Sequence, residues 1–373
     1  MTTIQTSSKV PKTTWADHLR LVWALAAKDI VDALKTKTTL TTIVISLLMV
    51  LFYRYFPLLT ADGDVLNVLL YTETESAVVT ALERSPVLAL YTYDSRERLM
   101  NAFADAEEVE LAVVIPETAV IQQQTGGPIT IDGYLMYWVN PAQRAEIKAL
   151  IEDELTTQLG APVTLNLTGH DVYFDANTFF FAFSSTIALL FITVMIGISL
   201  IPNLMVEEKL AKTLDALLVS PASAFHLVMG KALAGLFYGL IGSAIVLIVF
   251  RYLILQWGLA ILAAVLATLL MVAVGLLLGS IVNGRAQLQL VAWFVAIPLM
   301  IPVILVALEG LVPSGAIAVM NWLPTVLLAK IFRLSLTPNA TIANYGAGLV
   351  VVTASILLLL ALEVWVVRQQ DRG

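Results

Sequence analysis

Histidines, a lysine next to glycine and clustered carboxylates are the residues of this chain that could do chemistry. The chain has three histidines, far apart in the sequence: His18, His170 and His226. Neither a His-Glu-x-x-His zinc motif nor a Gly-x-Ser-x-Gly nucleophile motif occurs. Gly230–Lys231 is similar to the end of a phosphate-binding loop, but Phe225 stands where that loop needs glycine and neither Ser nor Thr follows the lysine. The sequence therefore predicts no catalytic residue, no metal site and no nucleotide site.

Two acidic runs, 107–110 and 152–154, hold most of the clustered carboxylates. Charge runs on helices usually form a solvated face, and neither run has the spacing of metal ligands. We interpret both as solvent-exposed surface rather than as an active site.

The composition determines the class of protein. Hydrophobic residues make up 59% and charged residues 13% of the chain, and the mean hydropathy is +0.86. A soluble domain has about 45–50% apolar and about 25% charged residues, so a soluble fold is excluded. The chain has no cysteine, so no disulfide can form.

The apolar residues are concentrated in six runs: 40–59, 178–202, 229–250, 259–282, 288–308 and 344–367. Each run approaches the roughly 20 residues that cross a bilayer, and only helices can do so singly. The centres of the runs hold almost no ionisable group, because Glu309 and Glu363 lie near the ends. This argues against an ion-coupled secondary transporter and against an intramembrane hydrolase.

The distribution of lysine and arginine predicts the orientation. Basic residues are frequent in the first forty residues, around 203–231, in the loop at Arg285 and at the C-terminal end. The positive-inside rule then places both termini in the cytoplasm and the long, acidic 60–176 segment outside, in a multi-pass protein of the cell (inner or plasma) membrane. The basic N-terminal arm lacks the pattern of a removable signal peptide.

The N-terminal arm also predicts an amphipathic helix in the cytoplasmic interface. The apolar face would consist of Trp15, Leu19, Val22, Ala26, Ile30 and Ala33. The polar face would consist of Asp17, Arg20, Lys28, Asp32 and Lys35. A polar segment that is periodic by chance is the alternative, and we favour the helix.

The 60–176 segment predicts an α/β domain, because strands alternate with helices along it. Strands are expected at 65–71, 87–93, 110–115 and 129–139, and helices at 75–84, 95–107 and 141–159. Residues 160–175 would return the chain to the membrane.

The predicted fold class is therefore a membrane all-α protein with six transmembrane helices and an inserted extracytoplasmic α/β domain. The parts are the cytoplasmic arm 1–39, the first span 40–59, the external domain 60–176 and a five-helix region 177–373, which contains a cytoplasmic loop at 203–228.

This loop carries the main functional signal. Leu210, Leu214, Leu217 and Leu218 fall on one helical face, whereas Glu207, Glu208, Lys212 and Asp215 point elsewhere. Pro221 stops the helix after Ser220. Periodicity alone leaves two interpretations open: an ordinary interfacial helix, or a helix that docks into the groove of a partner.

The loop resembles that of the permease subunits of type-2 ABC exporters. The matching positions are Glu207, Glu208, Thr213, Leu214, Leu217, Leu218, Ser220, Pro221, Gly230 and Lys231. Lys212 stands where that family usually has glycine, and Asp215 replaces its glutamate. Shorter likenesses follow in the family's order at Lys28–Asp29, Ala112–Pro116, Asn140–Pro141, Leu323–Pro324 and Arg333.

The resemblance implies a half-transporter that pairs with a second permease, either identical or a paralogue, and rests on a separate ABC ATP-binding subunit. ATP and Mg would bind that partner chain, and this chain would hold no cofactor. The residues expected to couple to the ATPase are Glu207, Glu208, Lys209, Thr213, Leu214, Leu217, Leu218 and Pro221. The remaining expected partner is the lipid bilayer, and no nucleic acid is expected.

A membrane-anchored sensor and a secondary transporter are the two alternative functions. A membrane-anchored sensor would use the external domain to bind a ligand, but the tail after the last span is too short for an output domain. A secondary transporter is disfavoured by the uncharged span centres. The cargo remains open among drugs, ions, lipids and glycans. Gly235/Gly239 and Gly275/Gly279 predict close helix contacts, either within one subunit or between two.

Overall fold

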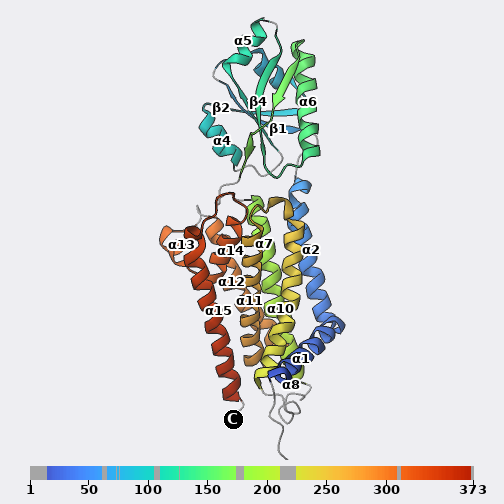
Figure 1. The fold of residues 1–373 in the computed structure, drawn as a ribbon, viewed down its shortest axis with the longest axis vertical. Coiled ribbons are helices and arrows are strands. Elements are labelled where there is room, and N and C mark those ends of the chain that lie inside the picture. The colour runs from blue at the N-terminus through green and yellow to red at the C-terminus, as the bar shows by residue number, and fades with distance from the viewer. Residues whose placement is uncertain are drawn as a thin grey trace, which may run out of the picture.

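The computed structural model shows a mostly helical molecule in which a long helical bundle carries a small α/β domain at one end (Figure 1). It describes residues 15–60, 65–72, 74, 76–104, 110–125, 127–173, 180–210, 224–308 and 312–370. The C-terminal helix ends at the opposite end of the bundle from the α/β domain (Figure 1). We call the end that bears the domain the outer end and the opposite end the inner end.

Within the described residues, five helices are long and apolar enough to cross a membrane, or up to seven spans exist if each of two bent helix pairs is one span. The five are Phe183–Leu210, His226–Val249, Trp257–Ile281, Arg285–Ala307 and Ile342–Val367. Five of the six predicted runs therefore lie on such helices.

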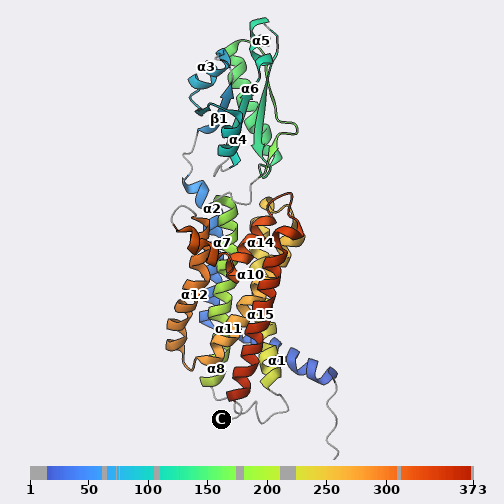
Figure 2. The same cartoon turned by 90° about the vertical axis from the view of Figure 1, so that its left-hand side faces the viewer.

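The first predicted run lies on α2 (Lys37–Thr60), which follows α1 (Trp15–Lys35) after a bend of 76°. In consequence α1 projects sideways at the inner end of the bundle, whereas α2 runs along it (Figure 2).

The second span is one continuous rod made of three elements. These are α7 (Phe180–Met195), the π-helical turn η1 (Ile196–Leu200) and α8 (Ile201–Leu210). We expected this run to end at residue 202, before the loop. The helix instead continues to Leu210, so Glu207, Glu208 and Lys209 belong to the membrane helix and not to a separate loop helix.

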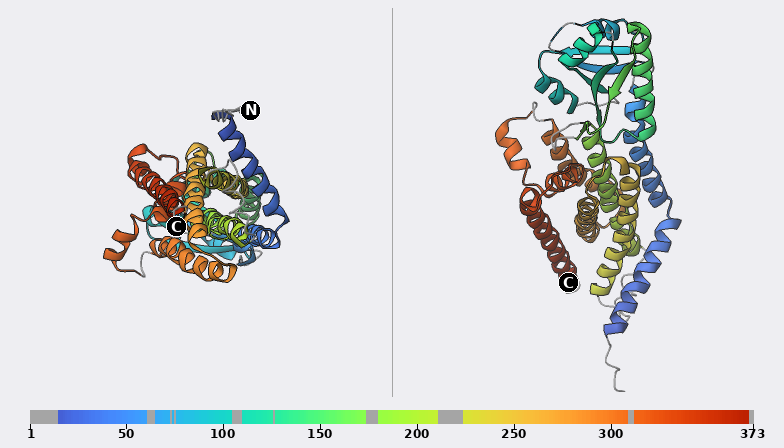
Figure 3. Two further views of the ribbon diagram at one scale, coloured as in Figure 1. Left: turned by 90° about the horizontal axis from the view of Figure 1, so that it is seen from below. Right: turned by 45° about the horizontal axis from the view of Figure 1, so that its top comes forward.

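The remaining helices follow in sequence order: α10 (Ala224–Val249), the short η2 (Arg251–Leu253), α11 (Trp257–Ile281), α12 (Arg285–Ala307), α13 (Ser314–Met320), α14 (Pro324–Leu334) and α15 (Ile342–Gln370). The helices α13 and α14 form the second bent pair, with an angle of 85°. Seen along the bundle, α11 lies near the centre, and α12 and α15 lie toward the outside (Figure 3).

Glycines allow the central helices to approach closely. A Cβ on Gly275 would lie 2.1 Å from the Gly197 carbonyl oxygen, and one on Gly239 would lie 2.3 Å from a Thr268 methyl carbon. Gly235 and Gly279 also face other helices of the same chain. The glycine pairs therefore pack within one subunit, which was one of the two interpretations left open.

The α/β domain contains one mixed sheet with the order β2-β1-β3-β4-β5, and β6 pairs with β4. Its strands are β1 (Leu66–Thr72), β2 (Leu88–Tyr93), β3 (Leu111–Ile115), β4 (Ile129–Met136), β5 (Val163–Asn166) and β6 (Asp171–Val172). β1, β2 and β3 are parallel, and β4 runs antiparallel to β3. The helices are α3 (Ala77–Arg84), α4 (Arg96–Ala104), α5 (Glu117–Thr125) and α6 (Pro141–Leu159).

Local sequence explains the longest of these helices. The Asn140 side chain accepts a hydrogen bond of 2.9 Å from the Gln143 amide, Pro141 occupies the first turn, and Gly160 ends α6 in the left-handed region at φ 66°. Two expectations need correction. Residues 160–175 do not simply return to the membrane but add β5 and β6, and the unexpected α5 follows Pro116.

Candidate functional site

The inner ends of α8, α10, α11 and α12 meet around the first three of the predicted coupling residues. Glu207, Glu208 and Lys209 occupy the last turn of α8. The other predicted coupling residues lie outside the described part of the chain: Thr213, Leu214, Leu217, Leu218 and Pro221. The geometry of the site therefore rests on the two ends of the loop.

Glu208 is the centre of a buried group of charges. Its carboxylate lies 2.8 Å from the ammonium of Lys231 on α10 and 3.3 Å from that of Lys28 on α1. Lys231 also lies 3.4 Å from the carboxylate of Asp29. Lys231 is fully buried, and Asp29 and Glu208 are less than a tenth exposed. Lys231 is thus the buried cation between two buried carboxylates, and Lys28, whose side chain is 51% exposed, adds a second positive charge from the solvent side.

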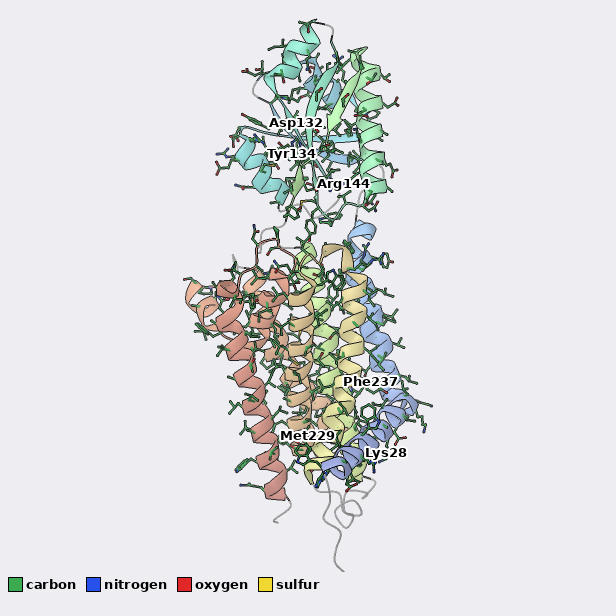
Figure 4. All side chains as sticks on the ribbon, viewed as in Figure 1. Lys28, Asp132, Tyr134, Arg144, Met229 and Phe237 are labelled. Atoms are coloured by element: carbon green, nitrogen blue, oxygen red, sulfur yellow. The ribbon has the colours of Figure 1, made fainter. Side chains whose placement is uncertain are left out.

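The packing of α1 against α10 brings these charges together. A Cβ on Gly230 would lie 2.8 Å from Leu25 Cβ, so α1 approaches α10 closely one residue before Lys231. Tyr238, further along α10, donates a hydrogen bond to the carbonyl oxygen of Ile30. His18 and His226 stack at the other end of the contact, with 2.6 Å between Nδ1 and Nε2. Figure 4 shows Lys28 and Met229 near each other at this inner end.

The packing divides the predicted apolar face of α1. Ala26 and Ala33 are buried against the bundle together with Asp29, whereas Trp15 and Leu19 remain exposed. The exposed apolar side chains of α1 also include Trp23. The segment is a helix, but its predicted apolar face is divided between the bundle and the exposed side, and the buried side includes a carboxylate that pairs with Lys231.

Lys209 caps the inner end of α11. Its ammonium donates hydrogen bonds to the carbonyl oxygens of Gly279, Ser280 and Val282, at 2.9, 2.6 and 3.0 Å. These carbonyls lack helical partners at a C-terminus, where the helix dipole also favours a cation. Glu363 on α15 is fully buried and interacts electrostatically with Lys209. Lys209 is thus directed into the bundle.

Glu207 connects α8 with α12. Its carboxylate lies 3.2 Å from the Arg285 guanidinium, and the side chains are 31% and 67% exposed. An exposed pair of this kind is worth about 0–1 kcal/mol, far less than a buried one, so it can break at little cost.

Arg285 also lines a cavity of about 180 Å³ between the second span and α12. Polar side chains of Ser199, Asn203 and Gln289 contribute to the wall, and Trp293 borders it. Ser199 is the last but one residue of the π-helical turn, and its carbonyl accepts a hydrogen bond of 2.7 Å from Asn203. Such π-turns are often found at functional sites.

The charged residues at the inner end are engaged with one another and with helix ends. No group of three or more possible metal ligands occurs in the described ranges. Lys231, the residue nearest to a phosphate-binding lysine in the sequence, is fully buried between two carboxylates. Sequence reasoning missed the roles of Asp29 and Lys231. Both residues lie in segments that resemble the permeases of type-2 ABC exporters, and both are charges that interrupt an apolar helical face or begin an apolar run, but neither signal indicates that they pair with each other.

Comparison with known families is consistent with this geometry. The model of the family described as ABC-2 family transporter protein matches residues 37–364, from the start of α2 almost to the end of α15. A search of the curated proteins finds no match.

Proposed function

The chain belongs to the ABC-2 family of transporter proteins, and we propose that it is the permease subunit of an ATP-driven exporter. In this proposal two permeases form the pathway, and a separate ABC ATP-binding subunit docks against the loop that follows α8. ATP and Mg bind to that subunit. The residues of this chain hold no nucleotide and transmit movement.

One observation supports this function most strongly. Both ends of the 211–223 loop are tied to each other, since Glu208 before the loop and Lys231 after it form a buried ion pair. A push on the loop would therefore displace α8 and α10 together, and α1 with them through Asp29 and Lys28.

The proposed arrangement has six spans, with α2 as the first. The basic N-terminal arm, the loop after α8 and the C-terminal end of α15 lie in the cytoplasm, and the α/β domain lies outside. In this arrangement α1 rests in the cytoplasmic interface with Trp15, Leu19 and Trp23 toward the lipid, where tryptophan is favoured. The bend of 76° between α1 and α2 is consistent with this position.

We place the contact between the two permeases on α12. Both α12 and α15 leave most of their apolar surface uncovered by the rest of the chain, and on α12 the exposed residues include Leu290, Phe294 and Ile297. The cavity distinguishes α12 from α15, because α12 lines it and α15 does not. The cavity lies beside this face and Trp293 borders it. Pairing through α12 would enclose two such cavities between the subunits and so create a pathway.

Docking can be tested by co-purification with the ABC ATP-binding subunit encoded beside the chain. Leu214→Asp should abolish association and the stimulation of ATP hydrolysis, because a charge would enter an apolar contact. Ile121→Asp, on the exposed surface of α5, is the matched control and should behave as wild type. Normal association and stimulation by the Leu214 variant would refute the docking proposal.

The paired arrangement has its own test, because the chain has no cysteine and any introduced thiol is unique. Phe294→Cys should form a disulfide-linked dimer in membranes under mild oxidation. Ile248→Cys, which is also exposed but lies on α10, should remain monomeric. Efficient cross-linking at Ile248 and none at Phe294 would place the contact elsewhere.

A further inference from the structure

Three consecutive residues at the end of α8 each contact a different part of the bundle. Successive residues of an α-helix point about 100° apart, so three in a row cover more than half of its circumference. Glu207 faces α12, Glu208 faces α10 and α1, and Lys209 faces the end of α11. The last turn of α8 is thus a hub that directly contacts four other elements.

The three contacts differ in strength because they differ in burial. Glu208 and its partner Lys231 are almost entirely shielded from water, so breaking that pair leaves a charge buried. Lys209 is held by three carbonyl oxygens at once. Only the Glu207–Arg285 pair is largely solvated, and Arg285 is 67% exposed. The contacts of Glu208 and Lys209 should therefore cost much more to break than the Glu207–Arg285 pair.

The releasable contact is also the one that reaches the cavity. Arg285 lines the cavity and begins α12, and Asn203 of α8 lines it one helical turn before Glu207. When Glu207 and Arg285 separate, α12 loses its ion pair with α8 and keeps only its packing contacts with the bundle, while α10 and α11 stay bound to α8 through charged groups. Movement of α12 away from α8 would change the width of the cavity without breaking the Glu208–Lys231 pair, which joins the two ends of the loop.

We propose that Glu207, Glu208 and Lys209 are positioning residues that distribute the displacement of the loop, with Glu208 and Lys209 as fixed holds and Glu207–Arg285 as the releasable latch between α8 and α12. This inference rests on the proposed function, because it needs a loop that is moved by an ATP-binding subunit. It adds how the helices move. α8, α10 and α11 move as one body. α12 moves with them while the Glu207–Arg285 pair is formed and stays behind when that pair is broken.

The experiment uses charge reversal at the exposed pair, where the fold tolerates substitution. Spin labels are attached at Gln287→Cys on α12, which is not among the residues proposed for the subunit contact, and at Met229→Cys on α10. Both positions are exposed, and the chain otherwise lacks cysteine. The distance distribution between them is measured in the complex with the ATP-binding subunit, without nucleotide and with ATP, Mg and vanadate. In the wild-type background the trapped nucleotide should shift the distribution.

Glu207→Arg places two cations face to face and opens the latch in every state. The label distribution without nucleotide should then broaden or shift toward the trapped one, and the nucleotide response should shrink about fivefold, as a loss of roughly one kcal/mol implies. Glu207→Arg combined with Arg285→Glu restores an opposite pair and should restore the wild-type response. Glu117→Arg, the same charge change on α5 of the α/β domain, is the control.

The outcomes distinguish the latch from the proposed function. A wild-type complex that responds to nucleotide, together with a Glu207→Arg complex that responds identically, overturns the latch and leaves the proposed function intact. A wild-type chain that binds no ATP-binding subunit overturns the proposed function and the latch with it. Loss in the single variant with recovery in the exchanged pair supports the latch, because a role limited to folding would not be restored by exchanging the charges.

Discussion

The inner and outer ends of the helical bundle are held by different kinds of interaction. At the inner end, ion pairs and a lysine-capped helix join α1, α8, α10, α11 and α12. At the outer end, the described contacts between the α/β domain and the bundle include a single tyrosine hydroxyl. Tyr137 donates hydrogen bonds to the carbonyl oxygens of Leu253, at 2.6 Å, and Leu336, at 3.4 Å.

The outer contact joins two connections that are already linked to each other. The amides of Leu255 and Gln256 both donate to the Ser335 carbonyl oxygen, so the turn before α11 and the turn after α14 form one platform. The hydroxyl of Tyr137 contacts this platform, and the Tyr137 ring stacks on the ring of Tyr173. Burial raises the pKa of the Tyr137 hydroxyl, and the nearby tyrosines Tyr252 and Tyr173 add to the effect. The hydroxyl therefore stays protonated and remains a donor.

The two ends of the bundle differ in how strongly their contacts resist separation. A buried ion pair resists separation by several kcal/mol, whereas one neutral hydrogen bond contributes about 1 kcal/mol. We therefore expect α1, α8 and α10 to move together at the inner end, with the exposed Glu207–Arg285 pair as the exception, and we expect the attachment of the outer domain to be the weaker one. Four substitutions test this contrast, beginning with the largest expected effect.

Lys231→Met should destabilise the protein most, by about 3–5 kcal/mol, because two buried carboxylates lose their central cation. The midpoint of unfolding by dodecyl sulfate in mixed micelles measures the loss. Adding Glu208→Gln and Asp29→Asn removes the stranded charges and should recover most of it. Wild-type stability of the single variant would show that the inner charges do not hold the bundle together.

Gly275→Ala should cost about 1–3 kcal/mol, since the new methyl group would meet the Gly197 carbonyl at 2.1 Å and force the second span away from α11. Gly258→Ala lies on the same helix near the outer end, with no atom within 4 Å, and should be neutral or slightly stabilising. The same unfolding assay compares the two. Equal effects would contradict the close inner crossing.

Tyr137→Phe should weaken the attachment of the α/β domain by about 1 kcal/mol, because the Leu253 carbonyl loses its donor. Faster cleavage by protease at the junction, with unchanged stimulation of the ATP-binding subunit, is the expected result. Tyr91→Phe, at a half-exposed position on β2, should change neither. Loss of stimulation in the Tyr137 variant would mean that the outer end also carries force.

Glu207→Gln should have the smallest effect on stability, below about 1 kcal/mol, although it lies one residue from the buried pair. Its partner Arg285 is 67% exposed, so water can hydrogen-bond to the guanidinium when the carboxylate is removed. The dodecyl sulfate midpoint should stay close to that of the wild type. A loss as large as that of Lys231→Met would show that the inner end has no releasable contact.

Much of this architecture was predictable because the signals are local. The length of each apolar run and the alternation of strands and helices between 65 and 159 require no knowledge of distant residues. The run at 40–59 also predicted α2, whereas the short β5 and β6 and the helix α5 after Pro116 carried weak patterns and were missed.

The charge cluster could not be predicted, because its members are brought together only by the tertiary fold. Asp29 and Lys231 are separated by 202 residues, and Lys28 and Glu208 by 180. In the sequence, Lys28–Asp29 resembled a short family motif within a basic arm, and nothing pointed to Lys231 as the partner of Asp29. Lys209 points into the bundle because the second span continues to Leu210. The sequence did not predict this continuation, because the hydropathy falls after residue 202.

The central claim is that the segment between α8 and α10 meets an ATP-binding subunit while the α/β domain lies across the membrane from it. Thr213→Cys and Tyr91→Cys each provide the only thiol of the chain, one in that segment and one on β2. A photoactivatable cross-linker attached to each in intact membranes tests both parts. The account predicts a cross-link to the ATP-binding subunit from position 213 and none from position 91. A cross-link from position 91 and none from position 213 would contradict it.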